Sequence, residues 1–318
     1  MNRTGKAVEL AMGECAVDVV IPSYNGRMLL ERLIANLDEV GLGSCITVVD
    51  DASTDGSVEF VRSRFPEVRV IARSENGGFS AAVNDGIRST QGEFVLVLNN
   101  DVEVTRGFLE PLVSLFDDES VFAVSPSIMV PALGNLDDGA KRAVWHHGIL
   151  YVDHVQGIDK VKPVFFVSGC ASLYRRSMLE VLSGFSDSFA PFYWEDVDLS
   201  YRAWKRGWKS LYQPASEVLH AHSVTLSKMP RLWVDTIKAR NQFLFIWRNI
   251  EDPDLIRQHR RWLLLVLAKR LVLGDRAFLR GWSEAKRRRG EALKFRAQDS
   301  QNRVLSDREI FAMTESVF

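Results

Sequence analysis

The sequence predicts an α/β fold of the doubly wound type, with a mainly parallel sheet and a helical C-terminal extension. Short apolar runs rich in β-forming residues alternate with segments in which apolar residues recur at helical spacing. The connections between these segments are short, as they are in right-handed βαβ units. Polar clusters follow the apolar runs, at the edge where open α/β sheets bind ligands. These three observations together predict a ligand-binding α/β domain.

The first hundred residues carry most of this alternation. We expect strands at 17–21, 46–49, 68–72 and 94–98, and helices at 28–40, 57–65 and 80–89. The apolar runs are unbroken because strands of a parallel sheet are buried on both faces. Further along the chain we expect helices at 108–116, 176–182 and 199–206 and strands at 121–130, 164–168 and 208–212, with one more strand ending at His220. Residues 131–162 show little periodicity and are interpreted as an insertion or lid across the cleft.

Four polar clusters follow the first four strands. They read SYNG at 23–26, DDASTDG at 50–56, ENGG at 75–78 and NND at 99–101. Because the loops of parallel strands share one edge, the clusters predict a single cleft for a polar, phosphorylated ligand, and their glycines allow close backbone approach. The spacing differs from G-x-G-x-x-G and from the Walker loop, which disfavours dinucleotide oxidoreductases and P-loop NTPases.

Two acidic clusters are candidates for chemistry. Asp101 in NND is a hard oxygen donor suited to Mg²⁺ or Mn²⁺. Taken alone, NND could equally be a polar turn that closes a strand. Glu195, Asp196 and Asp198 could likewise be the acidic N-terminus of a helix. The rest of the chain has to decide between these interpretations.

A series of motifs resembles the inverting glycosyltransferases of family 2, and more narrowly the bacterial rhamnosyltransferase-like members. The motifs are VVIPSYNG, VVDDASTDGS, NGGFSAAVNDGI, LNNDVEV, FVSGCASLYRR and GFSDSFAPFYWEDVDLSYRAWKRG. They cover about residues 17–225 in the family's order and spacing. The resemblance implies the GT-A type fold, a nucleotide-diphospho-sugar donor and a divalent metal.

The resemblance also implies roles for individual residues. The donor would contact Pro22, Tyr24, Asn25, Asp51, Asn76, Gly77 and Asn100; the metal would bind Asp101 and His220; the acceptor would contact Trp194 and Glu195; and Asp196 would be the catalytic base. Two departures from the family pattern stand out. Asn99 replaces the first aspartate of the D-x-D motif, and the usual H-x-x-G-x-S lacks its glycine, so His222 is an alternative to His220.

The chemistry of inverting transfer fits these residue types. A hydroxyl that attacks the sugar carbon must lose its proton, and a carboxylate such as Asp196 can accept it. The aromatic neighbours Phe192, Tyr193 and Trp194 would raise the pKa of this base and offer faces for sugar stacking. A divalent metal would neutralise charge on the departing diphosphate.

Composition narrows the class of protein. The chain has 318 residues, 46% hydrophobic and 25% charged, as in soluble globular proteins. The net charge of −1 gives no global field that would favour nucleic acid as a partner. The three scattered cysteines suggest neither a disulfide framework nor a zinc site, and the first residues lack the apolar core of a signal peptide. We therefore expect a cytoplasmic protein.

Positive charge is concentrated near the C-terminus. Residues 238–296 contain 16 Lys and Arg against 6 Asp and Glu, and the apolar stretches at 240–248 and 260–273 are flanked by these cations. Basic amphipathic helices can lie on anionic membrane surfaces, here the cytoplasmic face of the inner membrane. The alternatives are that the apolar faces pack on the catalytic domain or join copies in a homo-oligomer.

We therefore predict a flexible lead-in (1–16), a GT-A catalytic domain (17–228) and a basic helical extension (229–318). The predicted activity is transfer of a sugar, first of all rhamnose, from a nucleotide-diphosphate donor to a glycan or polyprenyl-linked saccharide. The alternatives are a non-catalytic sugar-nucleotide or glycan-binding protein and a nucleotidyltransferase. A nucleotidyltransferase would carry a basic, glycine-rich loop after its first strand, where this chain has PSYNG.

Overall fold

The computed structural model of the protein describes residues 16–220 and 229–316. Its N-terminal half is built from β-α-β units. The elements in chain order are β1 (Val17–Ser23), α2 (Arg27–Glu39), β2 (Ile46–Asp50), α3 (Ser57–Arg64), β3 (Arg69–Ala72), α4 (Phe79–Ser89) and β4 (Phe94–Leu98). The four strands and three helices expected in this region are confirmed. His222 and most of the expected lead-in lie outside the described residues.

A single large sheet runs through the domain, in the strand order β10-β12-β6-β11-β4-β1-β2-β3. Its remaining strands are β6 (Val121–Val130), β10 (Lys162–Pro163), β11 (Ala171–Arg175) and β12 (Lys209–His220). The pairings give β3, β2, β1, β4, β6 and β12 one direction and β10 and β11 the other. The sheet is therefore mainly parallel, as the sequence predicts. Two short strands, β5 (Val102–Val104) and β7 (Leu136–Asp137), pair at its side.

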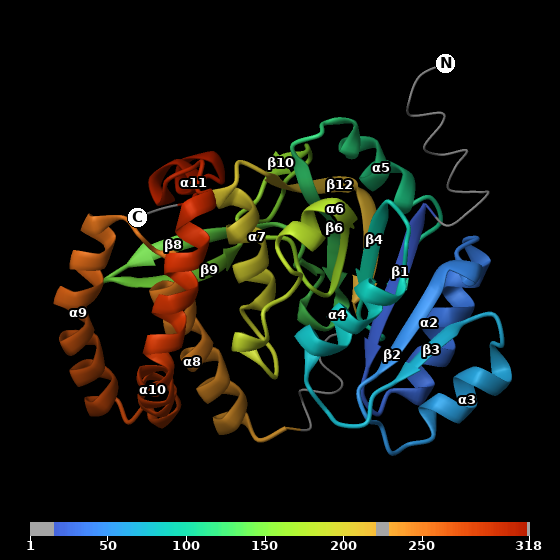
Figure 1. The fold of residues 1–318 in the computed structure, drawn as a ribbon, viewed down its shortest axis with the longest axis horizontal. Coiled ribbons are helices and arrows are strands. Elements are labelled where there is room, and N and C mark those ends of the chain that lie inside the picture. The colour runs from blue at the N-terminus through green and yellow to red at the C-terminus, as the bar shows by residue number, and fades with distance from the viewer. Residues whose placement is uncertain (1–15, 221–228, 317–318) are drawn as a thin grey trace.

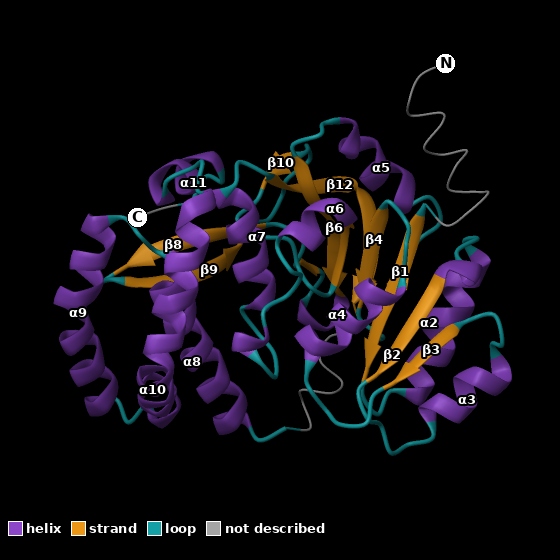
Figure 2. Cartoon of the chain, viewed as in Figure 1, coloured by secondary structure: helices purple, strands orange, loops and turns teal. Residues whose placement is uncertain are grey.

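Both faces of the sheet are covered. Along β1, Val19 and Ile21 face one core with α2, whereas Val20 faces another core with α4. This alternation explains why the strand is apolar throughout. Figure 2 shows the sheet in one half of the molecule and the C-terminal helices in the other.

One predicted strand is wrong. Residues 164–168 are irregular, and the strand of this region is β11, which begins at Ala171. The run is buried without joining a ladder: the amide of Val164 bonds to the carbonyl of Ser210, and the amide of Val167 bonds to Ser200 Oγ. An apolar run of this length predicts that the segment is buried, but it does not show whether the segment pairs with a strand of the sheet.

Other boundaries differ by smaller amounts. The expected helix at 108–116 is α5 (Leu109–Val113) followed by a 3-10 turn, and the helix at 176–182 is α6 (Arg176–Val181). Helix α7 (Glu195–Lys205) begins four residues earlier than expected. The two expected strands at 208–212 and up to His220 are one strand, β12, with a bulge between Gln213 and Glu217. Residues 131–162 include a hairpin of β8 (Lys141–His146) and β9 (Ile149–His154).

The C-terminal helices pack against α7 and this hairpin. They are α8 (Arg231–Asn249), α9 (Pro253–Val272), α10 (Arg276–Asp299) and α11 (Asp307–Met313), drawn in orange and red in Figure 1. Thirteen of the 19 residues of α8 are buried, and its Phe245 packs 5.3 Å from the ring of Tyr201 in α7. In the described residues, every helix is too short or too polar to span a bilayer. The core that α8 completes therefore includes residues on both sides of position 228.

The cysteine prediction needs a correction. Cys45 is disulfide-bonded, whereas Cys170 is a buried free thiol. The scattered positions in the sequence hid this pairing, because spacing alone does not report which cysteines meet in space. The cysteine count therefore gives no support to a reducing compartment.

Candidate active site

A cleft of about 510 Å³ opens where β1, β2 and β4 end. Nine residues singled out from the sequence line it: Pro22, Tyr24, Asp51, Asn76, Asn100, Asp101, Glu195, Asp196 and His220. These residues come from six separate segments of the chain. The sheet topology brings them together because the loops of its parallel strands share one edge.

Asp51 joins two of the loops at the floor of the cleft. Its Oδ1 accepts hydrogen bonds from the amide of Gly77 and from Arg73 Nη1, both at 2.9 Å, and its Oδ2 accepts one from the amide of Gly78 at 2.8 Å. Gly78 has φ +83°, and a Cβ there would lie 2.6 Å from the carbonyl oxygen of Pro191. Only glycine fits this approach between the two walls of the cleft.

Asn25 and Gly77 support the cleft without lining its described wall. The side-chain oxygen of Asn25 accepts a hydrogen bond from the amide of Thr54 at 2.8 Å, and the Asn25 amide donates to Ser53 Oγ at the same distance. These bonds tie the loop after β1 to the loop after β2. Asn100 acts similarly, because its Nδ2 donates to Ser23 Oγ at 2.9 Å.

Asp101 and His220 form the candidate metal centre. His220 Nε2 lies 3.2 Å from Asp101 Oδ1, and the free thiol of Cys170 lies beside them. Burial lowers the pKa of His220, but the Cys170 thiol and the Asp101 carboxylate more than offset this and raise it. Among the described residues, no cluster of three or more His, Cys, Asp or Glu side chains could hold a metal. Two protein ligands completed by substrate phosphates are, however, a usual arrangement for Mg²⁺.

Asp196, which is half-buried, and Glu195, which is buried, are adjacent carboxyl groups at the start of α7. Burial raises the pKa of Asp196, although hydrogen bonds from the amides of Gly169 at 3.1 Å and Val197 at 2.8 Å counteract this. Burial and the charge of Asp196 raise the pKa of Glu195 well above its usual range. Glu195 Oε2 has no hydrogen-bond partner among the described residues. A carboxyl group with a raised pKa is suited to proton transfer near neutral pH.

The turn before α7 is strained and is fixed by a residue that sequence reasoning missed. Tyr193 and Trp194 have φ values of 69° and 79°, which residues other than glycine rarely adopt. Asn241 in α8 is fully buried and its Nδ2 donates to the carbonyls of Phe189, Phe192 and Tyr193 at 2.6, 3.0 and 2.8 Å. The C-terminal helices thus position the residues that lead into Asp196.

A second cavity, of about 630 Å³, adjoins the cleft at Asp196. It is bordered by the β8–β9 hairpin, α8 and the start of α10, and shares Asp138, Ser168, Tyr193 and Asp196 with the cleft. Trp194 lines this cavity and not the cleft. Lys238 stands 4.4 Å from the ring of Tyr193 on one wall. Asp196 therefore borders both the cleft and the second cavity.

Asp138 organises one wall of this second cavity. It forms an ion pair with Lys141 and lies 2.8 Å from His154 Nδ1. The hydrogen bond with His154 and the charge of Lys141 outweigh the burial of Asp138 and lower its pKa to about 2. The charge of Lys141 also opposes the rise in the pKa of Asp196. Sequence reasoning missed this cluster, because the residues belong to a segment without periodicity.

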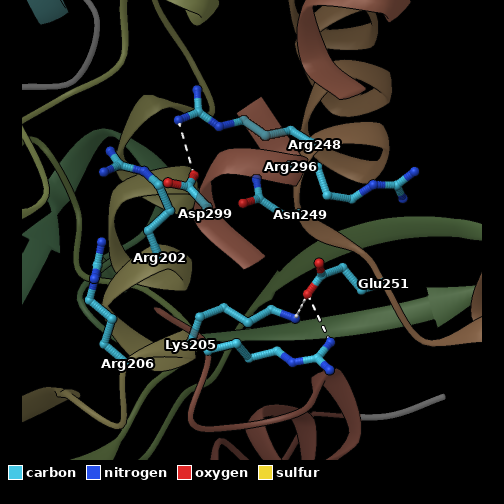
Figure 3. Close-up of a pocket in the computed structure, with 9 residues that line it drawn as sticks. Arg202, Lys205, Arg206, Arg248, Asn249, Glu251, Arg296 and Asp299 are labelled. Carbon is cyan, nitrogen blue, oxygen red and sulfur yellow. Dashed lines mark hydrogen bonds and ion pairs between the residues drawn. The ribbon is translucent and has the colours of Figure 1, made fainter. Parts of the chain in front are cut away.

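Helix α7 is held by ion pairs along its length, from Asp198 in its first turn to Lys205 at its end. Asp198 is fully buried and lies 2.7 Å from Arg202 Nε and 3.1 Å from Arg248 Nε. Figure 3 shows the basic pocket beside this network, where Arg248 contacts Asp299, and Lys205 and Arg303 share Glu251. The pocket holds only about 20 Å³, room for little more than one water. Its cations therefore fasten α7 to the C-terminal helices.

The fold is of the GT-A type, as two solved structures show. The structure of GalNAc-T7 with UDP, GalNAc and Mn²⁺ superposes with a TM-score of 0.60 at 18% identity, over 74% of this chain and 48% of that one. A mannosyltransferase from Pyrobaculum calidifontis, solved with GDP-Man and Mn²⁺, gives 0.55 at 19% identity, over 93% and 79% of the two chains. At these identities the likeness shows the fold.

Residues 18–183 match the family described as glycosyl transferase family 2, and the chain belongs to that family. It is similar to the N-acetylglucosaminyl-diphospho-decaprenol L-rhamnosyltransferase of Mycobacterium tuberculosis, with 27% identity over 77% of this chain and 88% of the relative. The protein is a glycosyltransferase, and the resemblance to rhamnosyltransferase-like members is confirmed.

Proposed function

We propose that the protein transfers a sugar, with inversion, from a nucleotide-diphosphate donor in the cleft to an acceptor in the second cavity. The observation that carries this proposal is the position of Asp196, which borders both spaces. An inverting displacement needs the acceptor oxygen and the leaving diphosphate on opposite faces of the sugar carbon. A base placed between two cavities meets this need.

In this mechanism Asp196 accepts the proton of the acceptor hydroxyl as that oxygen attacks the sugar carbon, while the bond from that carbon to the diphosphate breaks. Its two amide donors, Gly169 and Val197, hold the carboxylate in place. Burial and the charge of Asp196 raise the pKa of the neighbouring Glu195 well above its usual range, which favours its neutral form. In that form Glu195, which lines the cleft and not the second cavity, can donate a hydrogen bond into the cleft without adding negative charge.

The donor nucleotide occupies the loops that follow β1, β2 and β3. Tyr24 is more than one-third exposed and offers a face for the base, next to Pro22 and Asn76 on the wall of the cleft. Asp51 already accepts three hydrogen bonds, so its role is to hold Gly77 and Gly78 toward the nucleotide. Asp51 would then act on the nucleotide through those glycines, without contacting the nucleotide itself.

The divalent metal, Mg²⁺ or Mn²⁺, would be held by Asp101 and His220 together with the donor diphosphate. When bound, it would offset the negative charge that builds on the departing diphosphate. Asn100 completes this side of the cleft through its bond to Ser23. Two relatives in fold carry Mn²⁺ and a nucleotide or nucleotide sugar, which supports this assignment.

The acceptor proposed for the second cavity is a lipid-linked saccharide. The cavity offers the ring of Trp194 for sugar stacking and Lys238 for a phosphate. The similar mycobacterial enzyme is named for a diphospho-decaprenol acceptor and for rhamnose transfer, so a deoxythymidine-diphosphate rhamnose donor is our first candidate. The basic C-terminal helices suit the anionic cytoplasmic face of the membrane as the place of reaction.

The test is turnover of a panel of nucleotide sugars by the purified full chain, with Mn²⁺, with Mg²⁺ and with chelator. Each donor is assayed alone and with an N-acetylglucosaminyl-diphospho-polyprenol acceptor. We expect metal-dependent release of nucleoside diphosphate from one donor, faster with acceptor and lost in Asp196→Asn. Tight binding of a donor without turnover under any condition would favour the non-catalytic binding protein instead.

A further inference from the structure

The outer face of helix α9 is apolar although nothing in the described structure covers it. Leu264, Leu265, Leu271 and Val272 are between 61% and 86% exposed, and their spacing places them on one face of the helix. Leu273, in the turn that follows, is 65% exposed. The inner face of α9 is also apolar and packs on the core through Leu263, Val266 and Leu267. Figure 1 shows α9 as the outermost helix, at the end of the molecule opposite α3.

Cations surround this apolar face. Arg260, Arg261 and Lys269 of α9 are exposed, as are Arg276 and Arg280 just after the turn. The sequence from 255 to 274 contains no Asp or Glu. Asp275 is the nearest acid, and it is paired with Arg270 at 2.8 Å. An exposed leucine face with a basic border is the composition of an interfacial helix that binds anionic lipid.

The same turn forms part of the second cavity. Leu273 belongs to the exposed face, and Asp275, Ala277 and Phe278 line the cavity next to Asp196. The turn is fixed, because the amide of Asp275 bonds to the carbonyl of Arg270 and its Oδ1 accepts from the amide of Phe278 at 3.0 Å. The apolar face and the mouth of the cavity are therefore held in a constant relation.

We propose that the outer face of α9 and the turn into α10 dock on an anionic lipid bilayer, which brings the mouth of the second cavity to the membrane surface. The role of this docking rests on the proposed function: it would present the saccharide of a lipid-linked acceptor to Asp196 while the lipid stays in the bilayer. A second copy of the chain is a poorer occupant of the face. A two-fold contact would oppose Arg260, Arg261 and Lys269 to their own copies.

The test is flotation of the full chain with vesicles of phosphatidylcholine alone or of equal parts phosphatidylcholine and phosphatidylglycerol. We compare the wild type with a triple variant of the turn, Leu271→Gln, Val272→Gln and Leu273→Gln. A matched control carries Leu133→Gln and Val181→Gln, which change exposed apolar residues elsewhere. We expect binding to anionic vesicles to fall at least about tenfold in the turn variant and to stay unchanged in the control.

A second variant, with Arg260, Arg261 and Lys269 changed to glutamine, separates charge from apolar contact. We expect its binding to anionic vesicles to weaken about fivefold for each cation removed. Donor turnover in solution, without vesicles, should be unchanged in both variants. If the proposed function is wrong, the turnover assay will show it, whereas the flotation assay tests membrane docking alone. The proposal would be overturned if the wild-type chain did not bind anionic vesicles, or if the turn variant bound them as well as the wild type does. The proposal would also be overturned if the wild type were a dimer, the turn variant were a monomer, and neither protein bound the vesicles.

Discussion

The side-chain amide of Asn241, in α8, donates a hydrogen bond to the main-chain carbonyl of Tyr193 at 2.8 Å, three residues before Asp196. The same amide group reaches the carbonyls of Phe189 and Phe192. A residue of the C-terminal helices thus fixes the strained turn that aims the proposed base. The candidate active site is therefore assembled from residues on both sides of position 228.

Replacing Asn241 by leucine should disturb this turn. The three carbonyls would lose a buried donor, which costs about 2 kcal/mol of folding free energy. We also expect kcat to fall by roughly tenfold to a hundredfold, because the start of α7 would be held less firmly. The measurements are chemical denaturation and donor turnover.

The matched control for this variant is Gln156→Leu. Gln156 also uses its amide to bind main-chain groups, both of them on Asp137, but it lies at the surface and lines neither cavity. Its kcat should stay near that of the wild type. An Asn241→Leu variant with normal kcat would show that the turn keeps its geometry without the amide.

Sequence reasoning found the cleft but missed what supports it. Asp101 and Asp196 meet in one cleft although 95 positions separate them, because each belongs to a motif in a loop at the same edge of the sheet. Asn241 belongs to no recognisable motif. The role of this single amide in an apolar helix depends on carbonyl groups that lie elsewhere in the chain, so the sequence around it does not reveal that role. The apolar run at 164–168 was mistaken for a strand because burial leaves the same pattern in a sheet and beside one.

Asp196→Asn should abolish turnover while donor binding persists. Asparagine keeps the shape but only one side-chain oxygen, so it can accept just one of the hydrogen bonds that the amides of Gly169 and Val197 donate to Oδ2 and Oδ1 of Asp196, and it cannot accept the proton of the acceptor. General-base catalysis contributes about 10²- to 10⁴-fold, so kcat should fall within that range. Single-turnover assays and calorimetric titration of the donor separate chemistry from binding. Asp153→Asn, an exposed carboxylate in the hairpin, serves as the control. A variant that kept more than a third of the wild-type kcat would exclude Asp196 as the base.

Glu195 should make the protein less stable as pH rises. Its folded-state pKa lies well above its usual value, so the stability that it contributes is complete below the ordinary glutamate pKa and is lost as pH rises through the raised one. Glu195→Gln cannot ionise. We therefore expect the Tm of this variant, relative to wild type, to increase with pH across a series from about pH 4 to about pH 9. A Tm difference that stays constant over this series would show that Glu195 titrates as an ordinary glutamate.

Gly78→Ala should cost more stability than Gly56→Ala. Gly56 lies in the left-handed helical region (φ 77°, ψ 18°), where an alanine carries about 1–2 kcal/mol of backbone strain. Gly78 has φ 83° and ψ 179°, a region that is essentially restricted to glycine. At Gly56 the new Cβ meets nothing within 4 Å, whereas at Gly78 it lies 2.6 Å from the carbonyl oxygen of Pro191. The excess loss in the Gly78 variant reports the greater strain together with this clash, and its KM for the donor should rise because Asp51 loses its fixed partner. Equal losses in urea denaturation would mean that the loop moves aside without cost.

Asp101→Asn should remove the metal dependence of nucleotide binding. The amide keeps an oxygen near His220 but loses the negative charge that a divalent cation requires. In wild type we expect Mn²⁺ to tighten the binding of the donor's nucleoside diphosphate, and chelator to reverse this. In the variant the affinities with and without Mn²⁺ should become equal, and both should match the wild type in chelator. Isothermal titration of the nucleotide gives this result without any turnover, with Asp153→Asn as the charge-matched control. If Mn²⁺ still tightened binding by the full wild-type factor in Asp101→Asn, the cation would have to be held by other groups of the cleft.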